Sequence, residues 1–383
     1  MSAGTAGGST IFGHHHINET GGDLCAARAR TAAAGTGSPI PRPSHRLRAV
    51  TDHALLLAAL RRLGLVGRDE NPDFAPLTGG VSSDIWRVDA ARGVFCVKRA
   101  LAKLKVAQDW RAPVGRNAFE VGWMETTSAI VPGATPRLLG HDPTAGLFAM
   151  EFLDPADHPL WKAELRAGSA DPAFAAEVGR RLARIHAGTA RDAAVAARFA
   201  TDDIFHAIRL EPYLLAAARA HPDRAAALEG LARRTAASRI ALVHGDVSPK
   251  NILVGRDGPI FLDAECAWYG DPAFDVAFCL NHLLLKCLWT PAATARFLAA
   301  FDALAAAWLA GVTWEPPAAA EARAATLLPG LLLARVDGKS PVEYLTRDRD
   351  KDRVRRVARR LLAEPPTGPG AVRDAWAEEL HHA

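Results

Sequence analysis

Residues 242–265, LVHGDVSPKNILVGRDGPIFLDAE, carry the most informative pattern in the chain. Two apolar runs flank a polar loop that holds Asp246 and, five positions later, Asn251; Asp263 follows twelve residues further on. Phosphoryl transfer from ATP needs such a set, because one carboxylate must orient the attacking hydroxyl while an amide and a second carboxylate hold Mg²⁺ against the phosphates. Loops between short strands can bring these groups together and keep them accessible.

Parts of this pattern also have a purely structural interpretation. The tripeptide His244-Gly245-Asp246 recurs by chance, and an Asp beside a turn often only caps that turn. The whole array of His-Gly-Asp, Asn251, an apolar strand and Asp263-Ala264-Glu265 is much harder to produce by accident. The complete pattern therefore favours a phosphotransferase site.

Secondary-structure signals divide the chain into a strand-rich front half and a helical rear half. A helix is predicted over 52–63, and strands over 85–88, 94–98 and 147–152. After Asp154 the sequence becomes rich in Ala, Leu and Arg, with helices predicted over 174–189 and 224–237. Strand signals return only at 240–243, 252–254 and 260–262. We therefore predict an α+β fold with a join near residues 151–157.

A glycine turn and a lysine lie upstream of the loop. Two Gly residues stand in the segment Thr78-Gly79-Gly80-Val81-Ser82, which fits a hairpin that closes over phosphates. This segment is neither a GxGxxG motif nor a P-loop, and a Gly-Gly pair is usually only a turn. The next β run ends in Lys98, which is either a phosphate ligand or a solvated lysine at a strand end.

With these motifs the sequence resembles the aminoglycoside phosphotransferase and choline kinase-like family of small-molecule kinases. The resemblance spans about residues 47–365 and is strongest over 240–285. It implies a protein-kinase-like bilobal fold, with a small β-rich N-terminal lobe and a larger, mainly helical C-terminal lobe. It also implies that Asp246 is the catalytic base and that Asn251 and Asp263 bind Mg²⁺. The segment 270–275, GDPAFD, resembles another family motif, in which Asp275 would anchor the catalytic loop from a helix start.

The same resemblance assigns the nucleotide site. Lys98 would contact the α- and β-phosphates of ATP, steered by Glu120 on the following helical segment, with Glu125 as the alternative partner. Thr78 to Ser82 would cover the phosphates, and backbone groups of Glu151 and Leu153 would hydrogen-bond the adenine. His244 is expected to support the loop rather than to take part in the chemistry.

Composition limits the class of protein. The 383 residues include 49% hydrophobic and 23% charged residues, as in globular proteins. The net charge of +4 is too small to argue for nucleic-acid binding, and the basic run 347–360 has interleaved acids that favour a salt-bridged surface helix. The most apolar run, 274–289, is interrupted by Asp275, Asn281, His282 and Lys286, so no membrane span is expected. Five cysteines without CxxC spacing and no secretory signal favour a cytoplasmic protein with reduced thiols.

We predict four regions along the chain: a disordered tail over 1–45, a nucleotide-binding lobe over 46–153, a catalytic and substrate lobe over 154–365, and a C-terminal tail over 366–383. The predicted function is transfer of the γ-phosphate of ATP, with Mg²⁺, to a hydroxyl of a sugar, amino alcohol or antibiotic. The alternatives are an inactive kinase-like nucleotide-binding module and a protein kinase, which would need His-Arg-Asp, Asp-Phe-Gly and Ala-Pro-Glu motifs. The acceptor's identity and the oligomeric state stay open.

Two observations bear on the acceptor without deciding it. Acidic and basic residues are about balanced from residue 290 onward, which weakens the case for a polycationic aminoglycoside. The segment 331–341 places Arg335, Asp337 and Lys339 after an apolar helix, where they either face an anionic or polyol substrate or surround a helix end at Gly338.

Overall fold

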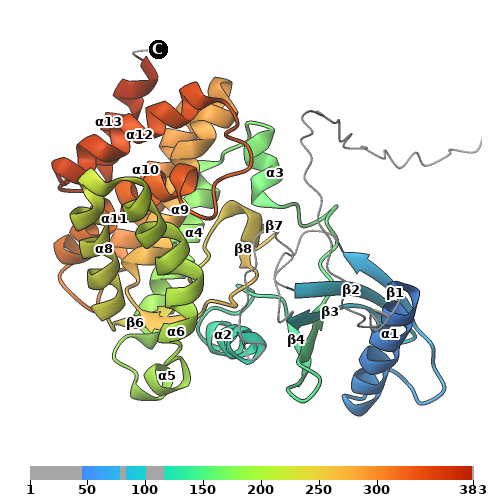
Figure 1. The fold of residues 1–383 in the computed structure, drawn as a ribbon. Helices are drawn as coiled ribbons and strands as arrows, with labels where there is room; N and C mark the ends of the chain where they lie inside the picture. Colours follow the sequence, from blue (N-terminus) through green and yellow to red (C-terminus); the bar gives the residue numbers. More distant parts are fainter. Residues whose placement is uncertain (1–44, 78–82, 101–115, 382–383) are drawn as a thin grey trace, which may run out of the picture. The chain divides into compact units, whose positions relative to one another are not determined.

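The computed structural model describes residues 45–77, 83–100 and 116–381 (Figure 1). The chain divides into two compact units, Met1–Arg48 and Ala49–Ala383, and all contacts described below lie within the second unit. The predicted phosphate-covering segment, Thr78 to Ser82, lies outside the described residues. So does the predicted N-terminal tail, except for its last residue.

A five-stranded antiparallel sheet forms the N-terminal lobe. Its strands have the order β1-β2-β3-β5-β4. Their bounds are β1 Asp73–Leu77, β2 Ser83–Ala90, β3 Gly93–Ala100, β4 Leu138–Asp142 and β5 Leu147–Glu151. The strands predicted over 85–88 and 94–98 are confirmed as β2 and β3, which pair as an antiparallel hairpin from Ser83↔Ala100 to Ala90↔Gly93. Strand β1 gave no signal in the sequence because its residues are nearly all exposed at the sheet edge.

Two helices accompany this sheet: α1 (His45–Arg62) and α2 (Arg116–Ile130). Leu56 and Leu60 of α1 are fully buried in one cluster with Trp86, Val88 and Phe95 of the sheet, as their spacing on one helix face requires. On α2, Val121 and Met124 pack with Phe148 of β5. Helix α2 therefore holds its remaining side chains at a fixed place beside β3 and β5.

The C-terminal lobe is mainly helical. Its α-helices are α3 Trp161–Arg166, α4 Pro172–Thr189, α5 Ala193–Arg198, α6 Asp202–Phe205, α7 Ala216–Ala220, α8 Ala225–Ala237, α9 Ala273–Trp289, α10 Thr294–Ala310, α11 Pro317–Asp337, α12 Asp348–Ala363 and α13 Pro369–His381. A π-helix, η1 (His206–Leu215), and short 3₁₀ turns, η2 Pro222–Arg224, η3 Pro249–Asn251 and η4 Pro291–Ala293, lie between them. Two small antiparallel pairs join β6 (Ala241–Val243) to β9 (Trp268–Gly270) and β7 (Ile252–Gly255) to β8 (Gly258–Phe261). The predicted α+β fold class is confirmed.

Helix α9 runs through the main core, and all but one of its residues are buried. One helical segment, Pro291–Ala310, is long and apolar enough to cross a membrane by length and composition. Phe297, Phe301, Leu304 and Trp308 of that segment are buried in the core cluster, so its apolar face is already covered by protein. A helix buried in a protein core can have the same length and apolar composition, so these two features are weak evidence for a membrane span.

The C-terminal region differs from the predicted tail. Residues 369–381 form α13, on which Val372 and Trp376 have no exposed surface. The mixed composition of this short segment hides two apolar positions one helical turn apart, which is why it gave no clear helix signal.

The charged segments near the C-terminus behave as surface elements. The predicted salt-bridged helix is α12, on which Arg355 pairs with Asp337 at 2.6 Å and Arg356 pairs with Glu379 at 2.6 Å. Helix α11 ends at Gly338, where a Cβ would lie 2.5 Å from the Ala334 carbonyl oxygen. Asp337 and Lys339 on either side are engaged in ion pairs, while Arg335 is turned inward and buried.

Candidate active site

The loop between β6 and η3 carries Asp246, and its path depends on Gly245. Gly245 has φ +81°, and a Cβ there would lie 2.8 Å from the carbonyl oxygen of Cys266. Both the backbone conformation and the close contact exclude a side chain at this position. The glycine of His-Gly-Asp is therefore required by the local geometry.

Asp275 anchors this loop, as the sequence predicts. Its carboxylate, fully buried in the first turn of α9, accepts the backbone N–H groups of His244 and Gly245, each at 2.8 Å. His186 Nε2 also lies 3.2 Å from Asp275 Oδ2, and Trp308 Nε1 donates to His186 Nδ1 at 3.1 Å. Because Nδ1 of His186 accepts that bond, its Nε2 carries the proton and donates to Asp275. Three helices thus cooperate to hold the loop.

Asp246 lies between two cations. Its Oδ2 is 3.0 Å from Arg209 Nη2 and 3.2 Å from Lys250 Nζ. Burial would raise the pKa of Asp246, but the charges of Lys250 and Arg209 outweigh it and hold the pKa below its usual value. Asp246 is therefore an ionised carboxylate at neutral pH, fixed in direction by its partners.

His244 supports the loop, as expected. Its Nδ1 accepts the backbone N–H of Asp246 at 3.1 Å, and its Nε2 lies 3.1 Å from the carbonyl oxygen of Leu262. The ring packs edge-on against Trp123, with centroids 4.7 Å apart. Burial lowers the pKa of His244, so the ring is neutral and ties the Asp246 loop to the strand before Asp263.

Asn251 and Asp263 lie close together across the β7–β8 hairpin. Asn251 accepts the backbone N–H of Leu262 at 2.9 Å, and its side-chain Nδ2 donates to the Asp246 carbonyl oxygen at 3.1 Å. That bond orients the amide and leaves its oxygen available. Asp263 has φ +66°, a conformation that Asp tolerates better than most residues. About 27% of its side chain remains exposed, although most of its neighbours are buried.

Lys98 on β3 joins the two lobes. Its Nζ lies 2.8 Å from Glu120 Oε1 on α2 and 2.5 Å from Asp263 Oδ1. Burial opposes the charge of Lys98, but Asp263 and Glu120 outweigh it and raise the pKa of the lysine. Burial raises the pKa of Glu120 to about 7 against the charge of Lys98, which Glu120 shares with Asp263. The alternative partner, Glu125, instead pairs with Arg198 at 2.5 Å, so the predicted pairing of Lys98 with Glu120 is confirmed.

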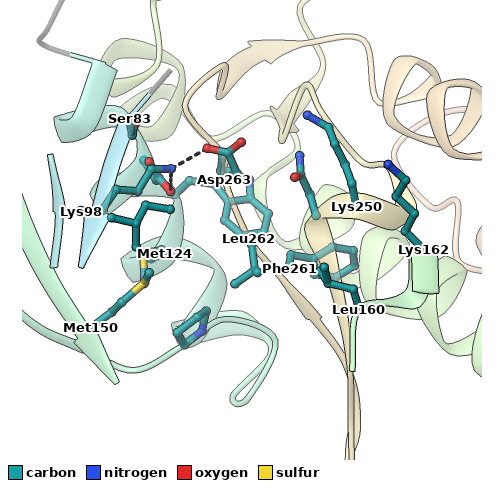
Figure 2. Close-up of a pocket in the computed structure, with 16 residues that line it drawn as sticks. Ser83, Lys98, Met124, Met150, Leu160, Lys162, Lys250, Phe261, Leu262 and Asp263 are labelled. Atoms are coloured by element: carbon teal, nitrogen blue, oxygen red, sulfur yellow. Dashed lines mark hydrogen bonds and ion pairs between the residues drawn. The ribbon is translucent and has the colours of Figure 1, made fainter. Parts of the chain in front are cut away.

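A cavity of about 360 Å³ lies beside these groups. Figure 2 shows Lys98, Met124 and Met150 on one side of it and Lys162 and Lys250 on the other. Its lining includes Ser83, Lys98, Glu120, Trp123, Met150, Lys162, Lys250, Asn251, Phe261 and Asp263. This is the combination of an apolar wall and convergent polar groups that is typical of a ligand site.

Among the predicted site residues that the structure describes, three do not line the cavity: Asp246, Glu151 and Leu153. Asp246 contacts one residue of the lining, Lys250, at 3.2 Å. The Glu151 backbone N–H donates to the Arg137 carbonyl oxygen at 3.0 Å, and its side chain accepts the Arg137 backbone N–H at 2.7 Å. Glu151 thus has only its carbonyl oxygen to offer to a ligand.

The side chains at the cavity could hold a magnesium ion that takes most of its other ligands from phosphate oxygens and water. Within residues 45–77, 83–100 and 116–381, no cluster of three or more His, Cys, Asp or Glu could hold a metal. The Asp263 carboxylate and the Asn251 amide oxygen at the cavity are oxygen ligands, which Mg²⁺ takes in small number alongside phosphate oxygens and water. These two residues are therefore the candidates for such an ion.

Sequence reasoning missed Arg209. It lies on π-helix η1 and donates to the Ile208 and Gly245 carbonyl oxygens as well as pairing with Asp246. A buried arginine in an irregular helix has no motif, although Pro212 inside the same helix signals an irregularity.

Similarity to known proteins bears on the family of this chain. Residues 73–319 match the model of the phosphotransferase enzyme family, APH. A methylthioribose kinase of Pectobacterium carotovorum is 27% identical over 233 residues, which are 53% of this chain and 57% of that protein. A methylthioribose kinase of Pectobacterium atrosepticum is 29% identical over 219 residues, 50% of this chain and 54% of that protein. The chain thus spans little more than half the length of these curated relatives.

A solved structure of a choline/ethanolamine kinase family protein from Mesorhizobium loti is 16% identical, with a TM-score of 0.45, over 83% of this chain and 99% of that one. The match to the family model covers more than half of the present chain and includes Lys98, Asp246, Asn251 and Asp263. The chain belongs to the phosphotransferase enzyme family.

Proposed function

We propose that this protein is an ATP-dependent phosphotransferase that moves the γ-phosphate of ATP to a hydroxyl group of a small molecule. The observation that carries the proposal is the Lys98 ammonium, which contacts Glu120 and Asp263 at 2.8 and 2.5 Å in a cavity that Asn251 also lines. One phosphate-binding cation and two oxygen ligands thus converge, and Asp246 lies on the adjacent loop.

Each residue has a distinct part in the proposed reaction. Lys98 contacts the α- and β-phosphates, and Glu120 fixes the flexible lysine in position. Asn251 and Asp263 hold Mg²⁺, which when bound offsets the phosphate charge. The carbonyl oxygen of Glu151 and the backbone N–H of Leu153 face the adenine, and Thr78 to Ser82 cover the phosphates.

Asp246 serves the acceptor in this mechanism. Its carboxylate orients the hydroxyl and accepts its proton as the new bond forms between that oxygen and the γ-phosphorus. The bond from the γ-phosphorus to the bridging oxygen breaks, and ADP leaves. Because the pKa of Asp246 is lowered, its main contribution is to hold the hydroxyl in line, and the proton moves late.

The test is ATP consumption by the purified chain with a panel of hydroxyl compounds, starting with sugars because the curated relatives are named methylthioribose kinase. We expect ADP and a phosphorylated product to form only when an acceptor is present. Loss of this turnover in Asp246→Asn would show that the reaction depends on this site. Tight ATP binding without any turnover would instead favour the second candidate, an inactive nucleotide-binding module. The presence of Lys98, Asp246, Asn251 and Asp263 together argues against that candidate.

A further inference from the structure

A second, smaller cavity adjoins the first one on the side of the Asp246 loop. It measures about 30 Å³, and we call it the basic pocket; it is lined by Lys162, Ser248, Pro249, Lys250, His282, Lys286, Arg335, Glu343 and Tyr344. Lys162 and Lys250 line both cavities. The Nζ of Lys250 lies 3.2 Å from Asp246 Oδ2, so a molecule that reaches the basic pocket shares a contact residue with the proposed base.

Two cations of the basic pocket are buried without a counterion. Lys286 is 1% exposed and Arg335 is 7% exposed, and neither forms an ion pair with any carboxylate in the part of the chain that the structure describes. Arg335 donates instead to Tyr213 and Ser340. Burying a charge without a partner is costly, so this arrangement favours a ligand of opposite charge. Burial and the neighbouring Lys162 lower the pKa of Lys286 to about 7, although the Glu343 carboxylate acts in the opposite direction.

Four buried polar atoms of the same residues also have no hydrogen-bond partner in the described structure. They are Ser248 Oγ, His282 Nε2, Arg335 Nε and Tyr344 OH. Buried polar atoms are nearly always paired, so four at one cavity indicate a bound polar group. Hydroxyl and guanidinium groups supply N–H and O–H donors, which suit the oxygens of an anion.

A cationic acceptor fits this pocket poorly. The stacked rings of Trp289 and Tyr344, 4.5 Å apart, are of the kind that binds quaternary ammonium groups. Lys286 already occupies that place, since its Nζ lies 4.4 Å from the centre of each ring. The only carboxylate in the lining, Glu343, is paired with Lys162.

We propose that the basic pocket binds an oxyanionic group of the phosphate acceptor, so that the acceptor is a small hydroxylated acid that carries a carboxylate or a phosphate ester. This inference rests on the proposed function, because it names the class of molecule that the phosphotransferase site receives. A volume of about 30 Å³ suits one such group, and the rest of the molecule extends past Lys162 and Lys250 into the larger cavity.

The experiment compares matched acceptors that differ in charge. One series consists of glycerol, glycerate and glycerol phosphate. A second series consists of ribose, ribonate and ribose phosphate. Choline and kanamycin serve as the cationic acceptors. We expect kcat/KM for at least one oxyanionic member to exceed that of its neutral counterpart by about 10- to 100-fold, the range of a buried charge-assisted contact. The carboxylate and phosphate members show which oxyanion is preferred.

Variants link the preference to the pocket. Lys286→Met should raise KM for the oxyanionic acceptor about tenfold or more while KM for ATP stays unchanged, because it removes the charge and keeps an unbranched side chain of similar length. Lys339→Met is the matched control, because Lys339 is exposed and pairs with Glu211 outside the pocket. Equal turnover of neutral and anionic acceptors, or no change in KM in Lys286→Met, would overturn the inference and leave the proposed function intact.

A binding measurement separates the two proposals when no acceptor reacts. Titration with inorganic phosphate and with malonate, followed by calorimetry, should show binding that Lys286→Met loses and Lys339→Met keeps. That result supports anion binding in the basic pocket even if the protein does not turn over ATP. A lack of ATP turnover would count against the proposed function and not against anion binding. No anion binding by the wild-type protein together with no oxyanion-dependent turnover would overturn the inference.

Discussion

Asp246 is the residue whose surroundings most constrain its chemistry. Arg209 and Lys250, at 3.0 and 3.2 Å, hold the pKa of its carboxyl group below 3.8 against the effect of burial. A lowered pKa means that the carboxylate is lost only as the pH falls below about 4. In the wild type, kcat should therefore show no ionisation of this group between pH 5 and 8.

The matching substitution is Asp246→Asn. It keeps the size of the side chain but removes the charge that, in the proposed mechanism, orients the hydroxyl and accepts its proton, so kcat should fall by about 10²–10⁴ with little change in nucleotide affinity. Steady-state kinetics and ATP titration measure the two quantities separately. Wild-type turnover in Asp246→Asn would show that Asp246 is not the base.

A second prediction concerns Asp263, for which the positive φ angle makes Asn a better replacement than Ala. At φ +66° an alanine would be strained by about 1–2 kcal/mol, whereas Asn adopts this conformation readily. Asp263→Asn should therefore fold normally and weaken binding of Mg·ATP much more than binding of metal-free ATP. Calorimetry in the presence and absence of Mg²⁺ checks this, and equal losses of both affinities would point to a role other than metal binding.

Residues within one short segment were the most predictable from the sequence. The spacing of Asp246, Asn251 and Asp263 points to a common site because a single loop and hairpin carry all three. Arg209 was not predicted, because its partner Asp246 lies 37 positions away. Lys286 was not predicted either, because one of the two rings beside it, Tyr344, lies on a distant segment. The interruption of the apolar run 274–289 by Lys286 was a usable signal, since an apolar helix rarely buries a lysine without a reason.

At the scale of elements, β3 and α2 meet through Lys98 and Glu120. Lys98→Ala should lower kcat/KM mainly through lost transition-state stabilisation, and Glu120→Gln should cost part of the same amount. Because both changes remove one function, the double variant should be markedly less impaired than the product of the single effects. Independent, multiplying effects would show that Glu120 does not position Lys98.

Glu125→Gln is the control for that cycle. Glu125 lies on the same helix but pairs with Arg198, and 49% of its side chain is exposed. Exposed ion pairs contribute about 0–1 kcal/mol, so this variant should keep nearly full activity. It should also show no coupling to Lys98→Ala.

Helices and strands with a regular spacing of apolar residues were predicted from the sequence. Elements that form only because they pair with a distant segment were not. The β2–β3 hairpin, α4 and α8 follow from alternation and helical spacing within each segment. Strand β9 has only three residues and exists because it pairs with β6. Its identity depends on a partner 27 residues away, which local periodicity does not encode.

At the scale of the whole molecule, α13 completes the main core. Trp376 is fully buried, so Trp376→Ala should lower the free energy of unfolding by about 3–5 kcal/mol, and Trp376→Phe should lower it by less. Urea unfolding measures the change. Glu378→Ala, on the same helix with 55% of its side chain exposed, should alter stability by less than about 0.5 kcal/mol. A loss in Trp376→Ala no larger than that of the control would mean that the segment is dispensable.

The positions of the buried thiols allow local opening of the molecule to be measured in several places. Cys96 lies in β3, Cys266 beside the Asp246 loop, and Cys279 and Cys287 in α9; all four are buried, and burial raises the pKa of each thiol. An alkylating reagent reaches such a thiol only after the surrounding structure opens, so the labelling rate at each cysteine reports a local opening equilibrium. Mass spectrometry of partly labelled protein would thus give separate opening free energies for the sheet, the catalytic loop and the central helix. Labelling of Cys96 well before Cys279 would mark the sheet as the part of the molecule that unfolds first.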